Sequence, residues 1–431
     1  MRNRFEGKND EAWNRLFDEL GILKCIEANG VFLISANQIK EYREPRLMTK
    51  FDHSVNLPRI FKDNGLSILP ITRGDYAISH FKAYQTFEPM TAKVQKITLP
   101  SHLHSLSDIS ITSEQVAMNG ALASGMIAQF MGEQIVVPTL SGRMGSGVFT
   151  FKILNSKSNA YQTLEVRNAQ MEIDGAYEGR ESLAIFEAKR ELADDFLVRQ
   201  LFYPFRAIGK KVSKPIRPIF MVYSNGLFHL NEFEFEEEDN YNSIRLVKQA
   251  SYMLDEETIT WRDIAELIAR TKVEPEPALP FPQADDFSRV VNLCEILDTK
   301  PLNRNDITEH YAFDARQTNY YTDAARYLGL IEKSDRSNGI PAYALGELGK
   351  RILSLEFKQR QLAFAERILA HAAFHETMQM YMDGHRMPDK NEVVAAMRNA
   401  HLYGVASEAT YERRASTVRS WVKWIADWLE A

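Results

Sequence analysis

Apolar and polar positions change their period several times in the middle of the chain. Short apolar runs bounded by turn residues are typical of strands, and they lie at residues 182–189, 218–224 and 227–235. Residues 194–206 instead place apolar side chains near helical spacing, and Pro204 is expected to end or kink that helix. A further strand is predicted to end at Asp174, and Gly175 and Gly179 suit the hairpin connection after it. The pattern therefore predicts the order strand, turn, strand, helix, strand.

A proline-rich segment separates a mixed part of the chain from a helical part. Residues 271–283 contain four prolines, which make a stiff, extended linker. Before it, the patterns predict helices at 10–24 and 113–132, sheet-like structure at 66–84, a Gly-rich loop at 141–148 and a charged edge strand within 232–239. After it, they predict helices at 286–300, 303–312, 314–329, 361–382, 390–401 and 408–430, and a two-stranded wing at 330–345 around Asn338-Gly339. The expected domains are 1–270, 284–358 and 359–431, with 271–283 as the linker.

Composition narrows the class of protein without specifying its chemistry. The chain has 431 residues, 45% hydrophobic and 26% charged, which predicts a globular protein of more than one domain. A net charge of −6 disfavours a basic coat for nucleic acid, although a basic face confined to one surface remains compatible with it. Two cysteines, Cys25 and Cys294, do not suffice for a disulfide framework or a zinc site. With neither a signal-peptide pattern nor a membrane-length apolar run, a cytoplasmic location is expected.

Three ionisable residues of the predicted hairpin have the chemistry of a metal-assisted hydrolase. Strands have a period of two, so Glu187 and Lys189 point to the same face, and Asp174 lies on the preceding strand. Two carboxylates and an ammonium group at the end of a sheet can hold a hard divalent cation and position a water. The sequence therefore predicts a Mg²⁺ site for phosphodiester hydrolysis. The alternative is a surface hairpin with scattered charges.

This spacing resembles the PD-(D/E)xK nuclease superfamily. The resemblance covers roughly residues 110–240 and matches Asp174 to the first acid, Glu187 to the second and Lys189 to the lysine of the motif. The chain departs from the motif at Ile173, where many members have proline.

The segment that follows the motif adds to the resemblance. Gln200 and Tyr203 are similar to a Gln-x-x-Tyr element that some branches of the superfamily carry after the lysine. The resemblance implies that Asp174 and Glu187 bind Mg²⁺ and that Gln200 supports the site. It implies that Lys189 orients or activates the attacking water and stabilises the charge of the transition state.

Two further residues are candidates for the same cleft. Glu114 begins the predicted helix 113–132, and in the superfamily an acid on this helix sometimes approaches the metal; the favoured alternative is an acid stabilised by the helix dipole. Arg143 lies in the predicted Gly-rich loop and is a candidate for a phosphate contact, with an unspecialised loop as the alternative. The loop is not a P-loop, because no Gly-Lys-Ser/Thr follows in register.

The helical part resembles winged helix-turn-helix domains that bind DNA. The order helix, helix, helix, wing at 284–358 would place the third helix in the major groove, and residues 359–431 look like a second such unit without a clear wing. The predicted DNA contacts are Arg316, Gln317, Asn319 and Tyr320 on the third helix, and Arg413, Arg414 and Thr417 on the last helix. The alternative for both units is contact with another protein.

Together these features predict an α/β nuclease domain, with a restriction-endonuclease-like mixed sheet flanked by helices, followed by mostly helical winged-helix domains. The predicted function is that of a Mg²⁺-dependent, sequence-specific endonuclease of double-stranded DNA, similar to a type II restriction enzyme. A homodimer is one expected assembly, because many such enzymes cut both strands as dimers, and no membrane association is expected. Two alternatives stay open: a repair or recombination nuclease acting on structured DNA, and a non-catalytic winged-helix regulator.

Overall fold

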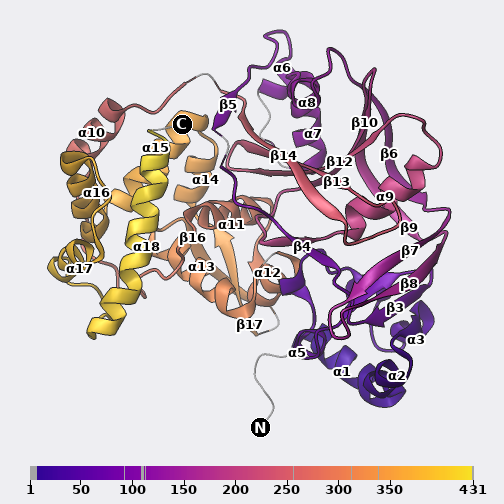
Figure 1. Cartoon of the computed structure of the whole chain (residues 1–431). Coiled ribbons are helices and arrows are strands. Elements are labelled where there is room, and N and C mark those ends of the chain that lie inside the picture. The colour runs from indigo at the N-terminus through magenta and orange to yellow at the C-terminus, as the bar shows by residue number, and fades with distance from the viewer. Residues whose placement is uncertain are drawn as a thin grey trace. The chain divides into compact units, whose positions relative to one another are not determined.

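A computed structural model describes residues 7–91, 93–107, 111, 113–255, 257–311, 313–337 and 339–429 (Figure 1). Its contacts divide the chain into two compact units, each described here by itself. The first unit comprises Met1–Ala92, Ser113–Tyr223 and Phe228–Tyr252, and the second comprises Lys93–Thr112, Ser224–Leu227 and Met253–Ala431. The prediction of a mixed α/β part followed by a helical part is confirmed at this coarse level.

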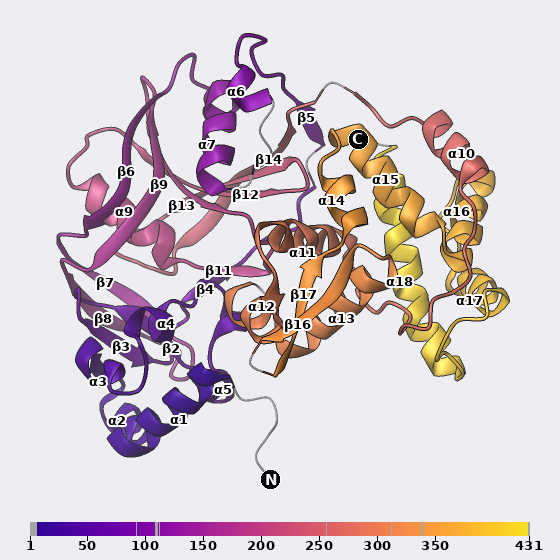
Figure 2. The same cartoon turned by 180° about the vertical axis from the view of Figure 1, so that it is seen from behind.

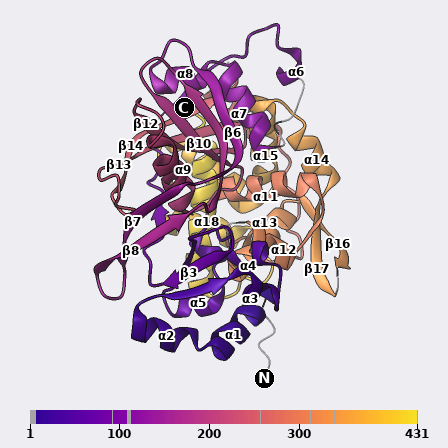
Figure 3. The same ribbon diagram turned by 90° about the vertical axis from the view of Figure 1, so that its right-hand side faces the viewer.

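The first unit begins with short helices packed around a small antiparallel sheet (Figure 3). The helices are α1 (Lys8–Leu20), α2 (Ile22–Asn29), α3 (Ala36–Lys40), α4 (Pro45–Thr49), η1 (Ser54–Asn56) and α5 (Arg59–Asp63). The strands, in sheet order, are β1 (Phe32–Ser35), β3 (Asp75–Ser79) and β2 (Ser67–Pro70). Gly21, at φ 60°, ends α1 and separates it from α2, so the helix predicted at 10–24 is two helices. The sheet-like structure predicted at 66–84 is confirmed by the antiparallel pair of β2 and β3.

A mixed sheet forms the centre of the first unit. Within this unit its strands follow the order β14 (Ile244–Met253), β13 (Leu227–Phe235), β12 (Ile216–Ser224), β10 (Leu183–Lys189), β9 (Gln170–Glu178) and β6 (Val137–Gly145). β10 runs antiparallel to β9 and parallel to β12. All seven residues of β10 are buried, as expected for a central strand with a parallel neighbour.

Helices and short strands cover this sheet. They are α7 (Glu114–Ala123), α8 (Met126–Met131), α9 (Arg199–Gly209), β11 (Asp195–Leu197) with its partner β4 (Tyr84–Thr86), and the β7 (Val148–Asn155) and β8 (Ala160–Arg167) pair. Both α7 and α9 contact β9 and β10. Because α9 connects β10 to the parallel strand β12, the predicted order strand, turn, strand, helix, strand is present.

Several local predictions in this unit need correction. Asp174 lies in the middle of β9 rather than at its end, and residues 141–148 are mostly strand, in β6, rather than a loop. The helix predicted at 113–132 is interrupted at Gly125, which has φ 79°. The segment predicted as a helix at 194–206 starts as strand β11, and Pro204 does not end α9.

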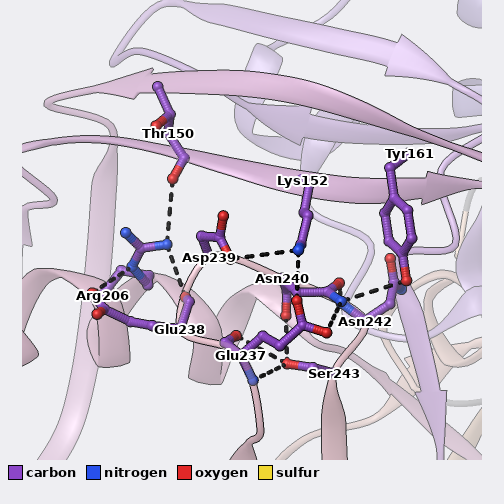
Figure 4. A network of polar contacts seen from close by, with 10 residues as sticks. All are labelled: Thr150, Lys152, Tyr161, Arg206, Glu237, Glu238, Asp239, Asn240, Asn242 and Ser243. Atoms are coloured by element: carbon purple, nitrogen blue, oxygen red, sulfur yellow. Dashed lines mark hydrogen bonds and ion pairs between the residues drawn. The ribbon is translucent and has the colours of Figure 1, made fainter.

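The acidic segment after β13 is a loop rather than part of an edge strand. β13 lies between β12 and β14, and residues 236–239 follow its end. Lys152 of β7 forms ion pairs with Glu237 at 2.5 Å and with Asp239 at 3.8 Å (Figure 4). Arg206 of α9 donates to the carbonyl oxygen of Glu238 at 2.8 Å. Cations of two neighbouring elements therefore hold this loop, which explains its concentration of acids.

The second unit is mostly helical. Its elements are β5 (Val94–Lys96), α6 (His104–Ser107), α10 (Trp261–Arg270), α11 (Phe287–Thr299), β15 (Leu302–Asn303), α12 (Arg304–His310), α13 (Ala315–Tyr327), β16 (Ile331–Ser337), β17 (Ile340–Leu345), α14 (Glu347–Leu353), α15 (Phe357–Leu369), α16 (Ala372–Gly384), α17 (Lys390–Asn399) and α18 (Glu408–Asp427). Its buried apolar side chains, from α10 to α18, form one cluster. The regions predicted as separate domains at 284–358 and 359–431 therefore share a core, and α10 and residues 271–283 belong to the same unit.

The element order predicted for a winged helix is present between α11 and β17 (Figure 2). Asp314 caps α13 by accepting hydrogen bonds from the backbone N–H groups of Arg316 and Gln317. The strands β15, β17 and β16 form an antiparallel sheet beside these helices. The turn predicted at Asn338 lies outside the described residues.

Candidate active site

The predicted catalytic residues lie around one cavity of the first unit, with a volume of about 280 Å³. The cavity is lined by Lys50, Glu114, Met171, Glu172, Asp174, Glu187, Lys189, Arg199, Gln200 and Pro204. Strands β9 and β10 supply the three motif residues, and α9, the next helix along the chain, supplies Gln200. Three cationic side chains and four carboxylates share this small volume.

Direct contacts join these residues into one cluster. The Lys189 ammonium forms an ion pair with Oε1 of Glu187, and both side chains are buried. Nε2 of Gln200 donates to the same Glu187 oxygen at 2.5 Å. Oδ2 of Asp174 accepts a hydrogen bond from the backbone N–H of Ala188 at 2.8 Å, which fixes this carboxylate between Glu187 and Lys189. The structure therefore brings Asp174, Glu187, Lys189 and Gln200 together as the motif predicts.

Burial and neighbouring charges act differently on the pKa values of Glu187 and Lys189. Burial raises the pKa of Glu187 to about 7, against the attraction of Lys189 and with the repulsion of Asp174. Burial would lower the pKa of Lys189, but Glu187, Asp52, Glu114 and Asp174 together raise it well above its ordinary value. The charged form of Lys189 is stabilised more strongly than that of Glu187, because Lys189 faces several carboxylates whereas Glu187 faces one close ammonium group. Lys189 is therefore a permanent cation at neutral pH.

Glu114 reaches this cavity from the first turn of α7. Burial raises its pKa to about 7, and repulsion from Glu191 and Asp174 adds to that effect while Lys189 opposes it. The sequence favoured an ordinary acid at a helix N-terminus for Glu114. In the structure Glu114 lies among the motif residues, and its pKa allows it to gain and lose a proton near neutral pH.

A segment of the N-terminal helical layer also contributes to the cavity. Lys50 lines it, and the Lys50 ammonium lies 3.7 Å from Oδ2 of Asp52. The other oxygen of Asp52, Oδ1, is buried without a hydrogen-bond partner among the described residues. Burial alone would raise the pKa of Asp52, but Lys189, Lys50 and Arg199 together lower it. Asp52 is therefore an ionised carboxylate close enough to Lys189 to stabilise its charge.

Hydrogen bonds fix this segment against β11, directly before α9. The backbone N–H of Leu197 donates to the carbonyl oxygen of Asp52 at 2.8 Å. Nδ1 of His53 lies 2.5 Å from the carbonyl oxygen of Asp195, and the backbone N–H of Ser54 donates to the Asp195 carboxylate at 2.9 Å. The N-terminal layer and the start of α9 are thus held together at the cavity.

The donor set of the cavity fits a hard divalent cation. The residues that the structure describes include no group of three His, Cys, Asp or Glu arranged as a ready metal site. Asp174 and Glu187 nevertheless each have one oxygen outside the hydrogen bonds above, and Oε1 of Gln200 is buried without a partner in the described part of the chain. Carboxylate and amide oxygens are the ligands that Mg²⁺ accepts, and the excess of carboxylates over cations favours positive charge there.

Arg143 lies beside the cavity rather than in its wall. On β6 it pairs in register with Glu172 of β9, and its Nε lies 3.4 Å from Oε1 of Glu172. Glu172 does line the cavity, and the Arg143 side chain is 64% exposed. This position is compatible with a phosphate contact next to the motif residues.

The predicted DNA contacts on α13 remain accessible to different extents. Arg316 is exposed, and Asn319 and Tyr320 are partly buried. Oε1 of Gln317 accepts a hydrogen bond from the backbone N–H of Asp314, so its amide also serves the helix cap.

The prediction for the last helix is wrong at one residue. Arg413 is exposed and Arg414 is partly buried, but Thr417 is fully buried and donates to Oδ1 of Asp285 at 2.5 Å. Thr417 therefore stabilises packing and cannot contact DNA. The sequence placed it on the polar half of the helix but contained no signal for its buried partner.

Sequence reasoning missed Lys50, Asp52, Glu172 and Arg199. Arg199 is adjacent to Gln200 at the start of the same helix, so its position was a usable signal. Lys50 and Asp52 precede the motif by more than a hundred residues and belong to no motif of their own. Only the packing of the N-terminal layer shows that they reach the cavity.

Comparison with known families gives three matches, each to a domain of unknown function. DUF6996 matches residues 10–78, DUF6997 matches residues 79–253 and DUF7226 matches residues 289–430. No curated protein and no solved structure matches the chain. The cavity takes Lys50 from the first matched segment and its other residues from the second. None of the helices in the described part of the chain is long and apolar enough to cross a membrane.

Proposed function

We propose that this protein is a Mg²⁺-dependent endonuclease that cleaves double-stranded DNA at a specific sequence, similar to a type II restriction enzyme of the PD-(D/E)xK superfamily. The observation that carries the proposal is the cluster of Asp174, Glu187, Lys189 and Gln200 around one cavity. The strand, turn, strand, helix, strand order that supports this cluster adds to it. A cytoplasmic location and a homodimer belong to the same proposal.

The reaction adds water to a backbone phosphorus atom and breaks one P–O bond. Asp174 and Glu187 would hold Mg²⁺, which when bound polarises a phosphate oxygen and lowers the pKa of a bound water. Lys189 stays protonated, so it stabilises the negative charge that develops on the phosphate oxygens and does not accept the proton of water. Gln200 orients Glu187 through its hydrogen bond.

Glu114 is the group best suited to accept the proton of the attacking water. Its pKa of about 7 matches the working range of a general base, and it lies on the same cavity as the motif residues. Lys50 and Arg199 supply further positive charge for the phosphates on either side of the cleaved bond. Every group of this mechanism belongs to the first compact unit.

The test of the proposed function is cleavage of genomic DNA that carries no methylation. The protein is incubated with this DNA and Mg²⁺, and the ends produced are sequenced. We expect discrete ends that share one short sequence motif. Ends that follow DNA structure rather than sequence would indicate a repair or recombination nuclease, and tight binding to one site without any cleavage would indicate a regulator.

Asp52 is expected to act as a positioning residue through Lys189. Asp52→Asn keeps the shape of the side chain and removes the carboxylate charge that favours the charged form of Lys189. We expect about a tenfold loss of cleavage at saturating DNA, comparable to other substitutions next to active-site ligands. The loss should fall on the rate at saturating DNA rather than on the affinity for DNA, and Asp52→Glu, which restores the carboxylate, should recover much of the rate.

The matched control for Asp52 is Asp63→Asn. Asp63 is an exposed acid of α5, in the same N-terminal layer, and its ion pair is with Arg59 at 3.2 Å. This variant should cleave like the unmodified protein at every pH. A loss of cleavage that Asp52→Glu does not recover would indicate a purely structural role of Asp52 and would contradict the assignment.

A further inference from the structure

Helices α13 and α18 of the second unit carry Arg316, Arg413 and Arg414. Nε of Arg316 donates to the hydroxyl of Tyr320 at 2.6 Å, and its guanidinium lies 5.3 Å from the centre of that ring. Arg413 is exposed, and Nε of Arg414 is buried without a hydrogen-bond partner. Among the described residues, none of these three arginines forms an ion pair. By contrast, Arg326 of α13 pairs with Asp323 at 3.1 Å.

A shared helix fixes α13 and α18 relative to each other. Nε1 of Trp421 donates to the carbonyl oxygen of Ala284 at 2.7 Å, and Thr417 donates to Asp285, so α18 is bonded to the start of α11. The Trp421 ring also lies 5.0 Å from Phe287 of α11 in an edge-on arrangement. α11 in turn packs against α13. The two arginine-bearing helices are therefore parts of one compact unit with a common core.

The electrostatics of Arg414 place it beside α13. Burial lowers the pKa of Arg414, and the adjacent Arg413 lowers it further. Tyr320, Asp285 and Asp323 oppose this shift, and two of these three residues belong to α13. Asp285 and Asp323 offset part of the charge of Arg414, whereas Arg316 and Arg413 have no ion pair among the described residues, so this surface keeps positive charge that backbone phosphates would offset.

We propose that α13 and the N-terminal half of α18 form a single basic surface, defined by Arg316, Tyr320, Arg413 and Arg414, that binds one DNA duplex. α13 contacts the bases, and Arg413 and Arg414 contact backbone phosphates that flank the same groove. This surface replaces the two separate DNA-binding units, one on each helix, that the sequence predicts. The inference rests on the proposed function only in taking DNA as the ligand, because it does not depend on cleavage.

DNA is the occupant that the chemistry favours over an acidic protein. Guanidinium groups bind phosphates through two parallel hydrogen bonds, and a duplex presents phosphates at regular spacing on both sides of a groove. Tyr320 holds Arg316 through a hydrogen bond and ring contact, which reduces the freedom that Arg316 loses on binding. An acidic partner protein is the competing occupant.

The test is the salt dependence of DNA binding by the full-length chain, measured by fluorescence anisotropy without Mg²⁺. The probe is a pool of random-sequence duplexes of about 30 base pairs, at salt concentrations between about 50 and 200 mM. For Arg413→Gln and for Arg414→Gln we expect the slope of log affinity against log salt to fall by about 1. We also expect affinity to fall about threefold to tenfold for each variant, with one duplex bound per chain.

Two further variants separate charge from folding. Arg414→Lys keeps the charge and should keep the salt slope, even though Arg414 is partly buried. Arg386→Gln is the matched control, because Arg386 is a surface arginine of the same unit that already pairs with Glu392 at 2.6 Å, and it should bind like the unmodified protein. An unchanged salt slope in both Arg413→Gln and Arg414→Gln, or two duplexes bound per chain, would overturn the proposal. If the salt dependence is as expected but the unmodified protein cleaves no DNA, only the proposed nuclease function is contradicted.

Discussion

Asp174→Asn is expected to reduce Mg²⁺-dependent cleavage by on the order of 10²–10³-fold, the range seen when a single group that stabilises a transition state is removed. The effect should be large because Asp174 is one of only two motif carboxylates that would hold Mg²⁺. Asparagine keeps an oxygen that can accept the hydrogen bond of Ala188, so the fold should be retained. Cleavage rates on a plasmid substrate, with DNA binding measured in parallel, check this expectation.

The matched control for Asp174 is an acid on another strand of the same unit. Glu165→Gln removes an exposed carboxylate of β8 whose ion pair is with Arg167 at 2.7 Å, and it should leave cleavage unchanged. DNA binding should be retained in both variants, because the basic surface on α13 and α18 is untouched. Full cleavage by Asp174→Asn would remove the basis for the proposed active site.

The motif residues could be predicted because their geometry is local. Glu187 and Lys189 are two residues apart on one strand, so the strand period alone places them on one face. The position of Asp174 can be predicted from the hairpin that joins β9 to β10, and that of Gln200 from the next helix. A short stretch of chain therefore contains most of the information on this cluster.

Lys50 and Asp52 could not be predicted because they reach the cavity through long-range packing. Their positions depend on hydrogen bonds to residues 195–197, which are more than 140 positions later in the chain. The periodicity of residues 50–54 gives no indication of these partners. The prediction that Thr417 contacts DNA was wrong for a related reason. A threonine on the polar half of a helix cannot be recognised as buried until its carboxylate partner is known.

Errors in the fold came from residues whose behaviour depends on their neighbours. The Gly-rich segment at 141–148 looked like a loop, yet pairing with β9 makes most of it a strand. Pro204 remains inside α9, where its missing N–H removes one bond that the surrounding packing offsets. The predicted boundary between two C-terminal domains disappeared because helices on both sides of it share one core.

The buried carboxylates of the cavity lower the stability of the fold. Four carboxylates line a small volume, and Glu114 and Glu187 both have a pKa of about 7 because burial, and to a lesser extent repulsion from Asp174, disfavours their charged forms. In the unfolded chain these groups would ionise near their ordinary values. Ionisation of Glu114 and Glu187 is therefore less favourable in the folded state than in the unfolded chain. The same excess of carboxylates is what would favour a bound cation.

Glu114→Gln is expected to make the protein more stable above neutral pH. The folded state raises the pKa of Glu114 from its ordinary value of 4.5 to about 7, so between these values the folded chain holds a proton that the unfolded chain has lost. Stability therefore falls as the pH rises through this window, and the full penalty is present above pH 7. Allowing for the partial exposure of Glu114, the penalty is on the order of 2 kcal/mol.

Unfolding of the full-length chain by urea at about pH 5 and about pH 8 measures this penalty. Glutamine cannot ionise, so Glu114→Gln should gain on the order of 2 kcal/mol of unfolding free energy at the higher pH and change little at the lower pH. Glu165→Gln, in an exposed position, should leave the pH dependence as it is in the unmodified protein. The gain in stability should accompany a loss of cleavage, because glutamine cannot accept the proton of the attacking water. A variant that is less stable than the unmodified protein at the higher pH would show that the Glu114 carboxylate is stabilised in the cavity, and the assignment of Glu114 as general base would then fail.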